Sequence, residues 1–592
     1  MIYHRFTSYL YDRSKLMLLA ILWLGGSAVA DHRAYFPHFT FRDNLWQTQL
    51  VLTNTTFLNT DVRLRAYSDE GDLVGETSFR LGAAASKVAD VQDYFGSMTV
   101  DRGWVEVVSE PGRVEGVVVF GNTATGGTTS LPMETQADQG LLFSFVPHDA
   151  DRESGIVLMN PDDRFATVVF VMVDMATEQR QVRVRTLAPR SRMVTMIEDL
   201  YEMTPPAHAR LEVKSSRDVV GFGLTFHEGA KQIVAVPAKP WRITDKQASI
   251  EMDWKAVLGD TPIGGAALAV HRGGQPELAA AAGLADMFTG EAFTTEHASS
   301  IGSITKTFVA TLAMMHVEEG RLSLDQTLDT WVPEVPHADR ITVEMMLNHS
   351  SGIAEYGTQP YVGALLERDF EDVWDPRELL AFALAEPPVF EPGTQYSYSN
   401  TNFLLLGMIL EQVGGQPLAA QLRARIIDPL DMTQTYLRGF EEPVQPHARG
   451  FIWDPQNLLG LGEIVDTHNM VHGSSSFADG GMVSTPSDLN RFIRALVGGE
   501  LLREETLARM LTPSKHSPFY ALGITLNDDG APDEATVGHD GAFVYGVANM
   551  VYFQDYDLAL SVTLDVYPLD DQYLIHVLSS AMSLGKVMAL MP

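Results

Sequence analysis

Short runs of alternating or β-branched apolar residues fill the first part of the chain. They occupy residues 49–53, 62–66, 105–108 and 117–120, and clusters of Gly, Asp and Asn separate them. Alternation with a period of two is typical of half-buried β-strands, and such clusters are typical of turns. Apolar residues at helical spacing are scarce in this region. We therefore predict that residues 31–238 are all-β.

This β-rich part also repeats itself. Three pairs of segments share one offset of 106 residues: 50–54 with 156–160, 93–95 with 199–201, and 105–107 with 211–213. Unrelated segments rarely keep a common register over the length of a domain. We predict two tandem sandwich-like modules, 31–136 and 137–238.

The pattern changes after the second module. Two prolines and a polar run interrupt the strand pattern, so residues 239–249 are predicted to be a linker. Apolar residues at helical spacing then occupy 304–318, 343–347, 403–413 and 488–496, and strand-like runs occupy 266–270, 550–553 and 558–564. We predict one α+β domain over residues 250–592 and expect the preceding modules to fold independently of it.

Residues 1–30 have the pattern of an export signal. Three basic residues precede an apolar run at 16–24, and the small-residue site Ala28-Val29-Ala30 follows. The run is roughly half of the ~20 residues needed to span a bilayer, which disfavours an uncleaved anchor. We predict cleavage after Ala30 and a periplasmic or secreted protein with no integral membrane segment.

Composition narrows the function classes. The formal net charge is −34, from 42 basic and 76 acidic residues, which disfavours nucleic acid or an anionic membrane surface as a partner. The chain has no cysteine, so disulfides, thiolate metal sites and cysteine nucleophiles are excluded. Its 592 residues are too many for one hydrophobic core. Nothing in the composition indicates the oligomeric state.

The first candidate for chemistry is a serine followed three residues later by a lysine. Ser303 opens an apolar-faced helix, and Lys306 lies on the same face one turn later. The amide groups at a helix N-terminus can receive an oxyanion, and the positive end of the helix disfavours a charged lysine. A helix cap with a surface lysine would explain the pair equally well, so the pair alone does not decide.

Two further motifs follow it. Tyr398-Ser399-Asn400 precedes an apolar helix pattern, and His539-Asp540-Gly541-Ala542 precedes a strand pattern. With these motifs in this order, residues 248–592 resemble the serine β-lactamase, DD-peptidase and esterase superfamily, in particular class C β-lactamases and penicillin-binding proteins. His-Asp-Gly stands where most β-lactamases have Lys-Thr-Gly. Two flanking stretches, 347–353 and 479–485, resemble the same superfamily.

The resemblance implies roles for four residues. Ser303 is expected to be the nucleophile that accepts the acyl group, and Lys306 its neighbouring base or proton relay. Tyr398 is expected to pass a proton to the leaving group and later to activate water. Asn400 is expected to hold the substrate amide or to orient Lys306, with a helix cap as the alternative.

The resemblance also implies a strand edge beside the substrate. His539 is expected to lie next to the leaving group, and Gly541 and Ala542 to line the substrate. The backbone amides of Ser303 and Ala542 are expected to form the oxyanion hole. His349 and Asp479 are interpreted as structural residues of their turns, and the spacing of the histidines and carboxylates suggests no metal.

These expectations combine into a predicted function. The chain is expected to be an exported serine hydrolase that forms an acyl-enzyme on Ser303 and needs no cofactor. Its substrate is expected to be a D-amino peptide, including one derived from peptidoglycan, or a carboxylic ester rather than mainly a β-lactam. The alternative is a non-catalytic protein that binds or senses a cell-wall peptide or a β-lactam.

Overall fold

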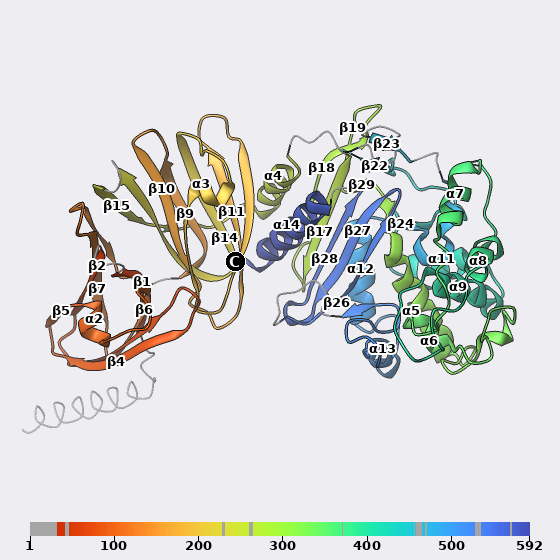
Figure 1. Cartoon of the computed structure of the whole chain (residues 1–592), viewed down its shortest axis with the longest axis horizontal. Helices are drawn as coiled ribbons and strands as arrows, with labels where there is room; N and C mark the ends of the chain where they lie inside the picture. Colours follow the sequence, from red (N-terminus) through yellow and green to blue (C-terminus); the bar gives the residue numbers. More distant parts are fainter. Residues whose placement is uncertain are drawn as a thin grey trace, which may run out of the picture.

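The computed structural model describes residues 32–592, apart from 42–45, 136, 228–230, 260–263, 370, 455, 457–463, 468–470, 527–533 and 569–570. The predicted export signal, residues 1–30, lies outside the described residues. A β-rich region is followed by a mixed region in which helices pack on an antiparallel sheet (Figure 1). The predicted order, all-β followed by α+β, is confirmed.

Module 1 consists of two four-stranded sheets. Their strand orders are β1-β6-β3-β4 and β5-β2-β7-β8. The elements are β1 (His32–Thr40), β2 (Trp46–Asn54), β3 (Thr60–Tyr67), β4 (Leu73–Leu81), β5 (Ser86–Asp90), α2 (Val91–Phe95), β6 (Arg102–Glu110), β7 (Val114–Asn122) and β8 (Thr128–Pro132). Alternate residues of β2 are buried, as its apolar pattern predicts.

Module 2 repeats this order of elements. They are β9 (Asp138–Pro147), β10 (Arg152–Met159), β11 (Ala166–Asp174), β12 (Arg180–Leu187), β13 (Arg192–Met196), α3 (Ile197–Tyr201), β14 (His208–His227) and β15 (Gln232–Pro237). Each of β5 and α2 recurs 106 residues later, as β13 and α3. The copies differ at one place, because β14 is a single strand of 20 residues where module 1 has the separate strands β6 and β7.

The third region is built on a seven-stranded antiparallel sheet. Its order is β19-β18-β17-β28-β27-β26-β25. The strands are β17 (Gly265–Arg272), β18 (Leu278–Asp286), β19 (Glu291–Ala292), β25 (Thr525–Leu526), β26 (Thr536–Phe543), β27 (Gly546–Phe553) and β28 (Leu558–Leu564). Helices α4 (Lys246–Leu258) and α14 (Asp571–Leu590) pack on one face, and α12 (Pro486–Val497) packs on the other.

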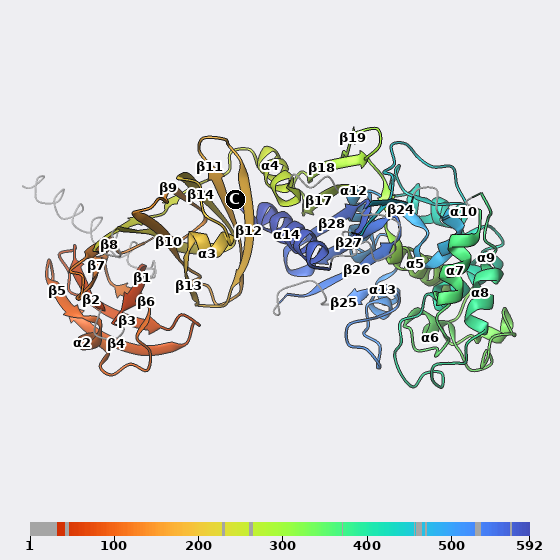
Figure 2. The same cartoon turned by 45° about the horizontal axis from the view of Figure 1, so that its top comes forward.

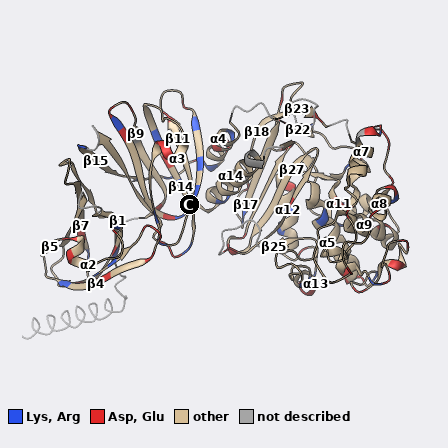
Figure 3. Cartoon of the chain, in the orientation of Figure 1, with Lys and Arg blue, Asp and Glu red and all other residues tan. Residues whose placement is uncertain are grey.

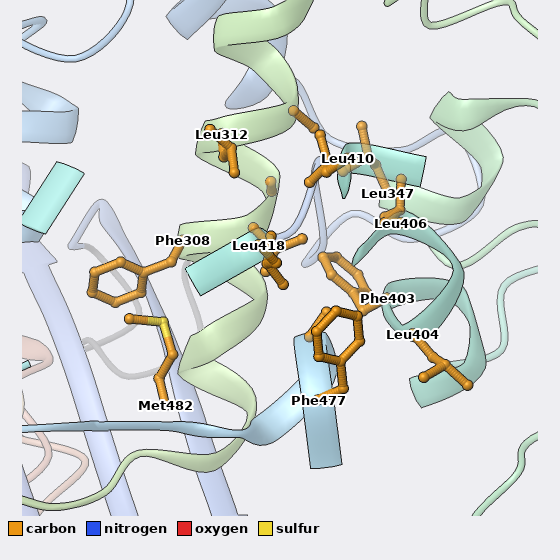
Figure 4. Packing of buried hydrophobic residues seen from close by; sticks show 14 of the residues in the cluster. Phe308, Leu312, Leu347, Phe403, Leu404, Leu406, Leu410, Leu418, Phe477 and Met482 are labelled. Atoms are coloured by element: carbon orange, nitrogen blue, oxygen red, sulfur yellow. The ribbon is translucent and has the colours of Figure 1, made fainter. Parts of the chain in front are cut away.

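A helical subdomain lies beside the end of the sheet that carries β26. Its longer helices are α5 (Thr305–Glu318), α7 (Gln359–Glu367), α8 (Pro376–Leu384) and α9 (Asn400–Gly414), and its short ones include α6 (Val343–Leu347), α10 (Leu418–Leu422) and α11 (Phe477–Gly480). Phe308 and Leu312 of α5 share a buried cluster with Phe403 and Leu406 of α9 (Figure 4). This apolar contact fixes α5 against α9, and both helices carry site residues at their first turns.

Within the described residues no single helix combines the length and the hydropathy needed to cross a bilayer. The pair 400–414 and 418–427 meets the criterion only when taken together, with a bend of 74° between its two parts.

The predicted linker is wrong. Residues 239–249 contain strand β16 (Lys239–Pro240), which pairs with β9, and the first turn of α4. The Asp245 side chain caps α4 by accepting a hydrogen bond of 3.0 Å from the Ala248 amide. The polar residues of this stretch therefore cap and begin a helix and do not form an extended linker.

The expected independence of the modules also conflicts with the structure. Ile250 and Trp254 of α4 share one buried cluster with Val169 and Val171 of β11, and α14 joins the same cluster. In two views α4 and α14 lie between module 2 and the seven-stranded sheet (Figure 1, Figure 2). A truncated chain that starts at Ala248 would lack the first residues of α4 and all of β11, and the apolar face of α4 would be exposed to water. The interface with module 2 is therefore part of the hydrophobic core.

Buried charges accompany the apolar contact. Lys214 of β14 forms an ion pair with Asp253 of α4 and donates to the Ser249 hydroxyl at 2.8 Å. Arg180 of β12 donates to the other oxygen of Asp253 at 3.0 Å. Figure 3 shows basic positions on the module 2 strands next to α4. Because Lys214 is fully buried, it depends on Asp253 for compensation of its charge, and Asp253 is compensated by Lys214 and Arg180 together.

Candidate active site

Ser303 lies in a short 3₁₀ turn, Gly302–Ile304, directly before α5. The sequence predicted that Ser303 opens the helix, and the structure places it one turn earlier in a tighter segment. Lys306, in the first turn of α5, is fully buried. Its Nζ donates to Ser303 Oγ at 2.9 Å, so the serine hydroxyl and the amine are in direct contact.

Two further acceptors hold the amine of Lys306. Its Nζ donates to Asn400 Oδ1 at 2.7 Å and to the backbone oxygen of Asp479 at 2.6 Å. Burial lowers the pKa of Lys306 to about 8, although the carboxylates of Asp479, Glu355 and Asp540 act in the opposite direction. Once deprotonated, the amine can keep both acceptors and still offer its lone pair to Ser303.

Tyr398 lies on the other side of the serine. Its hydroxyl forms a hydrogen bond with Ser303, and Lys306 Nζ lies 5.0 Å from the centre of its ring. The side chain is 37% exposed, yet desolvation of the hydroxyl raises the pKa of Tyr398 above its ordinary value. The residue thus reaches from solvent to the Ser303 hydroxyl.

Asn400 begins α9 and is held by a carboxylate. Its backbone amide donates to Glu355 Oε2 at 2.6 Å, and its Nδ2 lies 3.3 Å from Glu355 Oε1. The amide side chain is therefore oriented with Oδ1 toward Lys306. Of the expected alternatives, this geometry fits orientation of Lys306. Glu355 was not among the predicted site residues; it lies just after the flanking stretch 347–353, which was the only signal for it.

Two glycines bring the turn at Ser303 against strand β26. A Cβ on Gly541 would lie 1.9 Å from the Ile301 oxygen and 2.8 Å from the Ser303 amide. A Cβ on Gly302, which has a φ of 46°, would lie 2.5 Å from the Ala542 amide. Only glycine tolerates such an approach. The amides of Ser303 and Ala542 are thereby placed side by side, as an oxyanion hole requires.

His539 is buried on β26 and belongs to a chain of hydrogen bonds. The Ser399 amide donates to His349 Nδ1 at 3.2 Å, so the His349 proton is on Nε2, 3.2 Å from the Tyr520 hydroxyl. Tyr520 in turn donates to His539 Nε2 at 3.1 Å, and His539 Nδ1 donates to the Asp540 oxygen at 2.5 Å.

This series of hydrogen bonds favours the neutral form of both imidazoles. Each ring nitrogen has a role that only one tautomer can fill, and burial lowers the pKa of His349 and of His539. The series of hydrogen bonds joins the segment that follows Tyr398 to strand β26. His349, interpreted as structural from the sequence, is buried and hydrogen-bonded, and its ring lies 4.3 Å from that of Tyr398. Tyr520 was not predicted, because no motif surrounds it.

Asp479 has a second contact besides the one through its backbone. Its Oδ2 accepts from the Tyr356 hydroxyl at 3.0 Å. Burial raises the pKa of Asp479 to about 6. From the sequence, Asp479 was interpreted as a structural residue of the glycine turn. In the structure its backbone oxygen also accepts a hydrogen bond from Lys306.

Comparisons with known proteins show which families and structures this chain resembles. The sequence model of the family described as Beta-lactamase matches residues 252–574, and that of a family of unknown function, DUF5719, matches residues 42–241. Esterase EstB of Burkholderia gladioli is 27% identical over 354 residues, which are 54% of this chain and 89% of that protein. Penicillin-binding protein 4* of Bacillus subtilis is 24% identical over 289 residues, 46% of this chain and 62% of that protein.

Among solved structures, D-amino acid amidase from Ochrobactrum anthropi SV3, complexed with L-phenylalanine amide, is similar with a TM-score of 0.50 and 26% identity. The match covers 57% of this chain and 98% of the amidase. The chain spans between 51% and 62% of the length of the first curated relatives that it matches. The family match over more than half of the chain shows that this chain belongs to the beta-lactamase family.

Proposed function

We propose that the protein hydrolyses esters or amides through an acyl-enzyme on Ser303. The observation that carries the proposal is the 2.9 Å contact between Ser303 Oγ and the buried Lys306 amine, whose pKa is lowered. A buried neutral amine in contact with a serine hydroxyl is suited to accept its proton.

In the first half-reaction, Ser303 Oγ bonds to the substrate carbonyl carbon while the bond from that carbon to the leaving group breaks. The serine proton passes to the Lys306 and Tyr398 pair and ends on the leaving group. The amides of Ser303 and Ala542 would stabilise the oxyanion. In the second half-reaction, water loses a proton to the same pair and attacks the acyl carbon, which releases a carboxylic acid and restores Ser303. The Lys306 amine and the Tyr398 hydroxyl both contact the Ser303 hydroxyl, so the pair is treated as one proton-transfer unit.

The proposed substrate is a D-amino peptide or amide, or a carboxylic ester, rather than mainly a β-lactam. A D-amino acid amidase and an esterase are among the similar proteins. Neutral His539 offers no permanent cation to a substrate carboxylate, unlike a lysine at the same place. A small molecule or a peptidoglycan-derived peptide would fit this class. We also propose that the chain is exported, on the pattern of residues 1–30.

Intact-mass analysis after treatment with a fluorophosphonate tests the nucleophile. The wild-type protein and Ser579→Ala, which changes an exposed serine of α14, should gain one adduct, whereas Ser303→Ala should gain none. An equal adduct on Ser303→Ala would refute the assignment. A panel of a chromogenic cephalosporin, a short-chain nitrophenyl ester and a D-alanyl-D-alanine peptide then ranks the substrate classes.

A further inference from the structure

Strand β26 places an exposed carboxylate next to the candidate active site. Asp540 follows the buried His539 and precedes Gly541, and its side chain is 71% exposed whereas that of His539 is 2% exposed. Along β26, Asp540 lies between His539, which is near Tyr398, and Ala542, the residue proposed for the oxyanion hole. This is the side on which a leaving group would depart, because Tyr398 is the proposed proton donor to it.

The carboxylate of Asp540 lacks a basic partner within the described part of the chain. Its one ion-pair contact is with His539 Nδ1, at 3.9 Å, and that ring is held neutral by the hydrogen bonds of its two nitrogens. The carboxylate of Asp540 is therefore exposed and has no cationic side chain that compensates it among the described residues.

Other carboxylates besides Asp540 act on this side of the site. The pKa of Tyr398 is raised by the carboxylates of Asp540, Asp479 and Glu355 as well as by desolvation. Burial favours the neutral form of the Lys306 amine. A leaving group that carries a carboxylate would therefore meet repulsion, and one that carries an ammonium would meet attraction.

We propose that Asp540 makes the leaving-group side of the site select esters and amides whose leaving group carries a positive charge and reject those whose leaving group carries a carboxylate. This inference rests on the proposed function, because it names the substrate class of the same site. Asp540 acts through charge and not through proton transfer, so it is a specificity-determining residue.

Three thioacetates test the proposal. Acetylthiocholine carries a trimethylammonium group, S-(3,3-dimethylbutyl) thioacetate is its neutral isostere, and S-acetyl-3-mercaptopropionate carries a carboxylate. The released thiol is measured with a chromogenic disulfide, and the absence of cysteine from the chain removes any background from the enzyme. The readout is kcat/KM for each charged substrate divided by that for the neutral one.

For an exposed charge near the reacting centre we expect the cationic substrate to exceed the neutral one by about three- to tenfold at low salt, and the anionic one to fall below it by a similar factor. Asp540→Asn should bring both ratios close to one, and high salt should do the same in the wild type. Asp555→Asn removes an exposed carboxylate beyond the open end of the β26–β27 hairpin and should leave the ratios unchanged. Ratios near one in the wild type, or ratios that Asp540→Asn does not alter, would overturn the proposal.

A second measurement separates this inference from the proposed function. Phosphorylation of Ser303 by a diethyl phosphorothioate that loses thiocholine is compared with that by the analogue that loses 3,3-dimethylbutanethiol, using intact mass. A preference for the cationic leaving group that Asp540→Asn abolishes supports the inference even if no thioacetate is turned over. Equal rates overturn the inference alone, whereas a Ser303 that accepts no fluorophosphonate overturns the proposed function.

Discussion

His349 and His539, which lie on different motifs, are joined through the hydroxyl of Tyr520, with heavy-atom distances of 3.2 and 3.1 Å. The bonds run in one direction, from the Ser399 amide to the Asp540 oxygen. This arrangement fixes which nitrogen of His539 is protonated and how the ring is oriented beside Tyr398.

Tyr520→Phe should release His539. The lost donor leaves His539 Nε2 unpaired, so we expect kcat/KM for a neutral ester to fall about five- to thirtyfold, from a loss of about 1–2 kcal/mol of positioning. The pKa of His539 should also rise toward its ordinary value, and the pH profile should gain a step that the wild type lacks. Tyr552→Phe, which removes a hydroxyl bound to Asp557 at the far end of β27, is the control and should keep the wild-type profile.

Activity should rise with pH through the pKa of the Lys306 pair. Burial lowers the pKa of Lys306 to about 8, and only the neutral amine can accept a proton. As pH increases, the neutral fraction increases, so kcat/KM for a neutral ester should climb, reach half of its plateau near pH 8 and level off about one pH unit higher. Lys306→Arg, which stays charged, should lose about 10²- to 10⁴-fold at every pH. A wild-type rate that falls from pH 6 to pH 8 would contradict a neutral lysine.

Gly541→Ala should disable the oxyanion hole. The new Cβ would meet the Ile301 oxygen at 1.9 Å and push the turn at Ser303 away from β26. Removal of one oxyanion donor typically costs about 10²- to 10³-fold in kcat, and we expect a loss of this size with KM little changed. Gly274→Ala, where a Cβ would meet nothing within 4 Å, should retain activity. Full activity of Gly541→Ala would show that the two amides do not act together.

His539→Lys should shift preference toward carboxylate-bearing substrates. A lysine would supply the cation that neutral His539 lacks. If this cation stabilises the transition state, kcat/KM for a carboxylate-bearing substrate should rise on the order of ten- to a hundredfold. The measurement is the ratio of kcat/KM for a cephalosporin to that for a neutral ester, in the wild type and the variant. Efficient turnover of cephalosporin by the wild type, with a ratio untouched by the substitution, would show that this position does not determine substrate class.

Asp253→Ala should destabilise the interface between module 2 and the sheet domain. It leaves Lys214 buried without its counter-charge, which typically costs about 3–5 kcal/mol. Denaturant unfolding followed by circular dichroism measures the loss. The double variant Lys214→Met with Asp253→Leu removes both charges and should recover most of it. A single variant as stable as the wild type would show that water, not Asp253, compensates Lys214.

Local patterns account for what the sequence predicted. Helix α9 and strand β28 were predictable because the spacing of large apolar residues sets the period of a helix or strand. The proximity of Ser303 and Lys306 was predictable because they lie one helical turn apart, whereas the other site residues were expected only from the resemblance to a known superfamily. The bond from His349 to Tyr520 spans 171 positions, and no local spacing encodes it. The predicted linker was wrong for the same reason, because the apolar face of α4 packs against β11, which is distant in the sequence.

The position of α14 has a consequence for synthesis of the chain. Val169, Val171 and Val173 of module 2 are buried in the finished protein by a cluster to which α14 contributes Val577, Ala581 and Leu584. A ribosome working at about 5–20 residues per second would need roughly 20–70 s to pass from β14 to α14. During that interval α4 alone could shield the apolar surface of module 2. A nascent chain of this kind would depend on a holding chaperone until its last helix emerges.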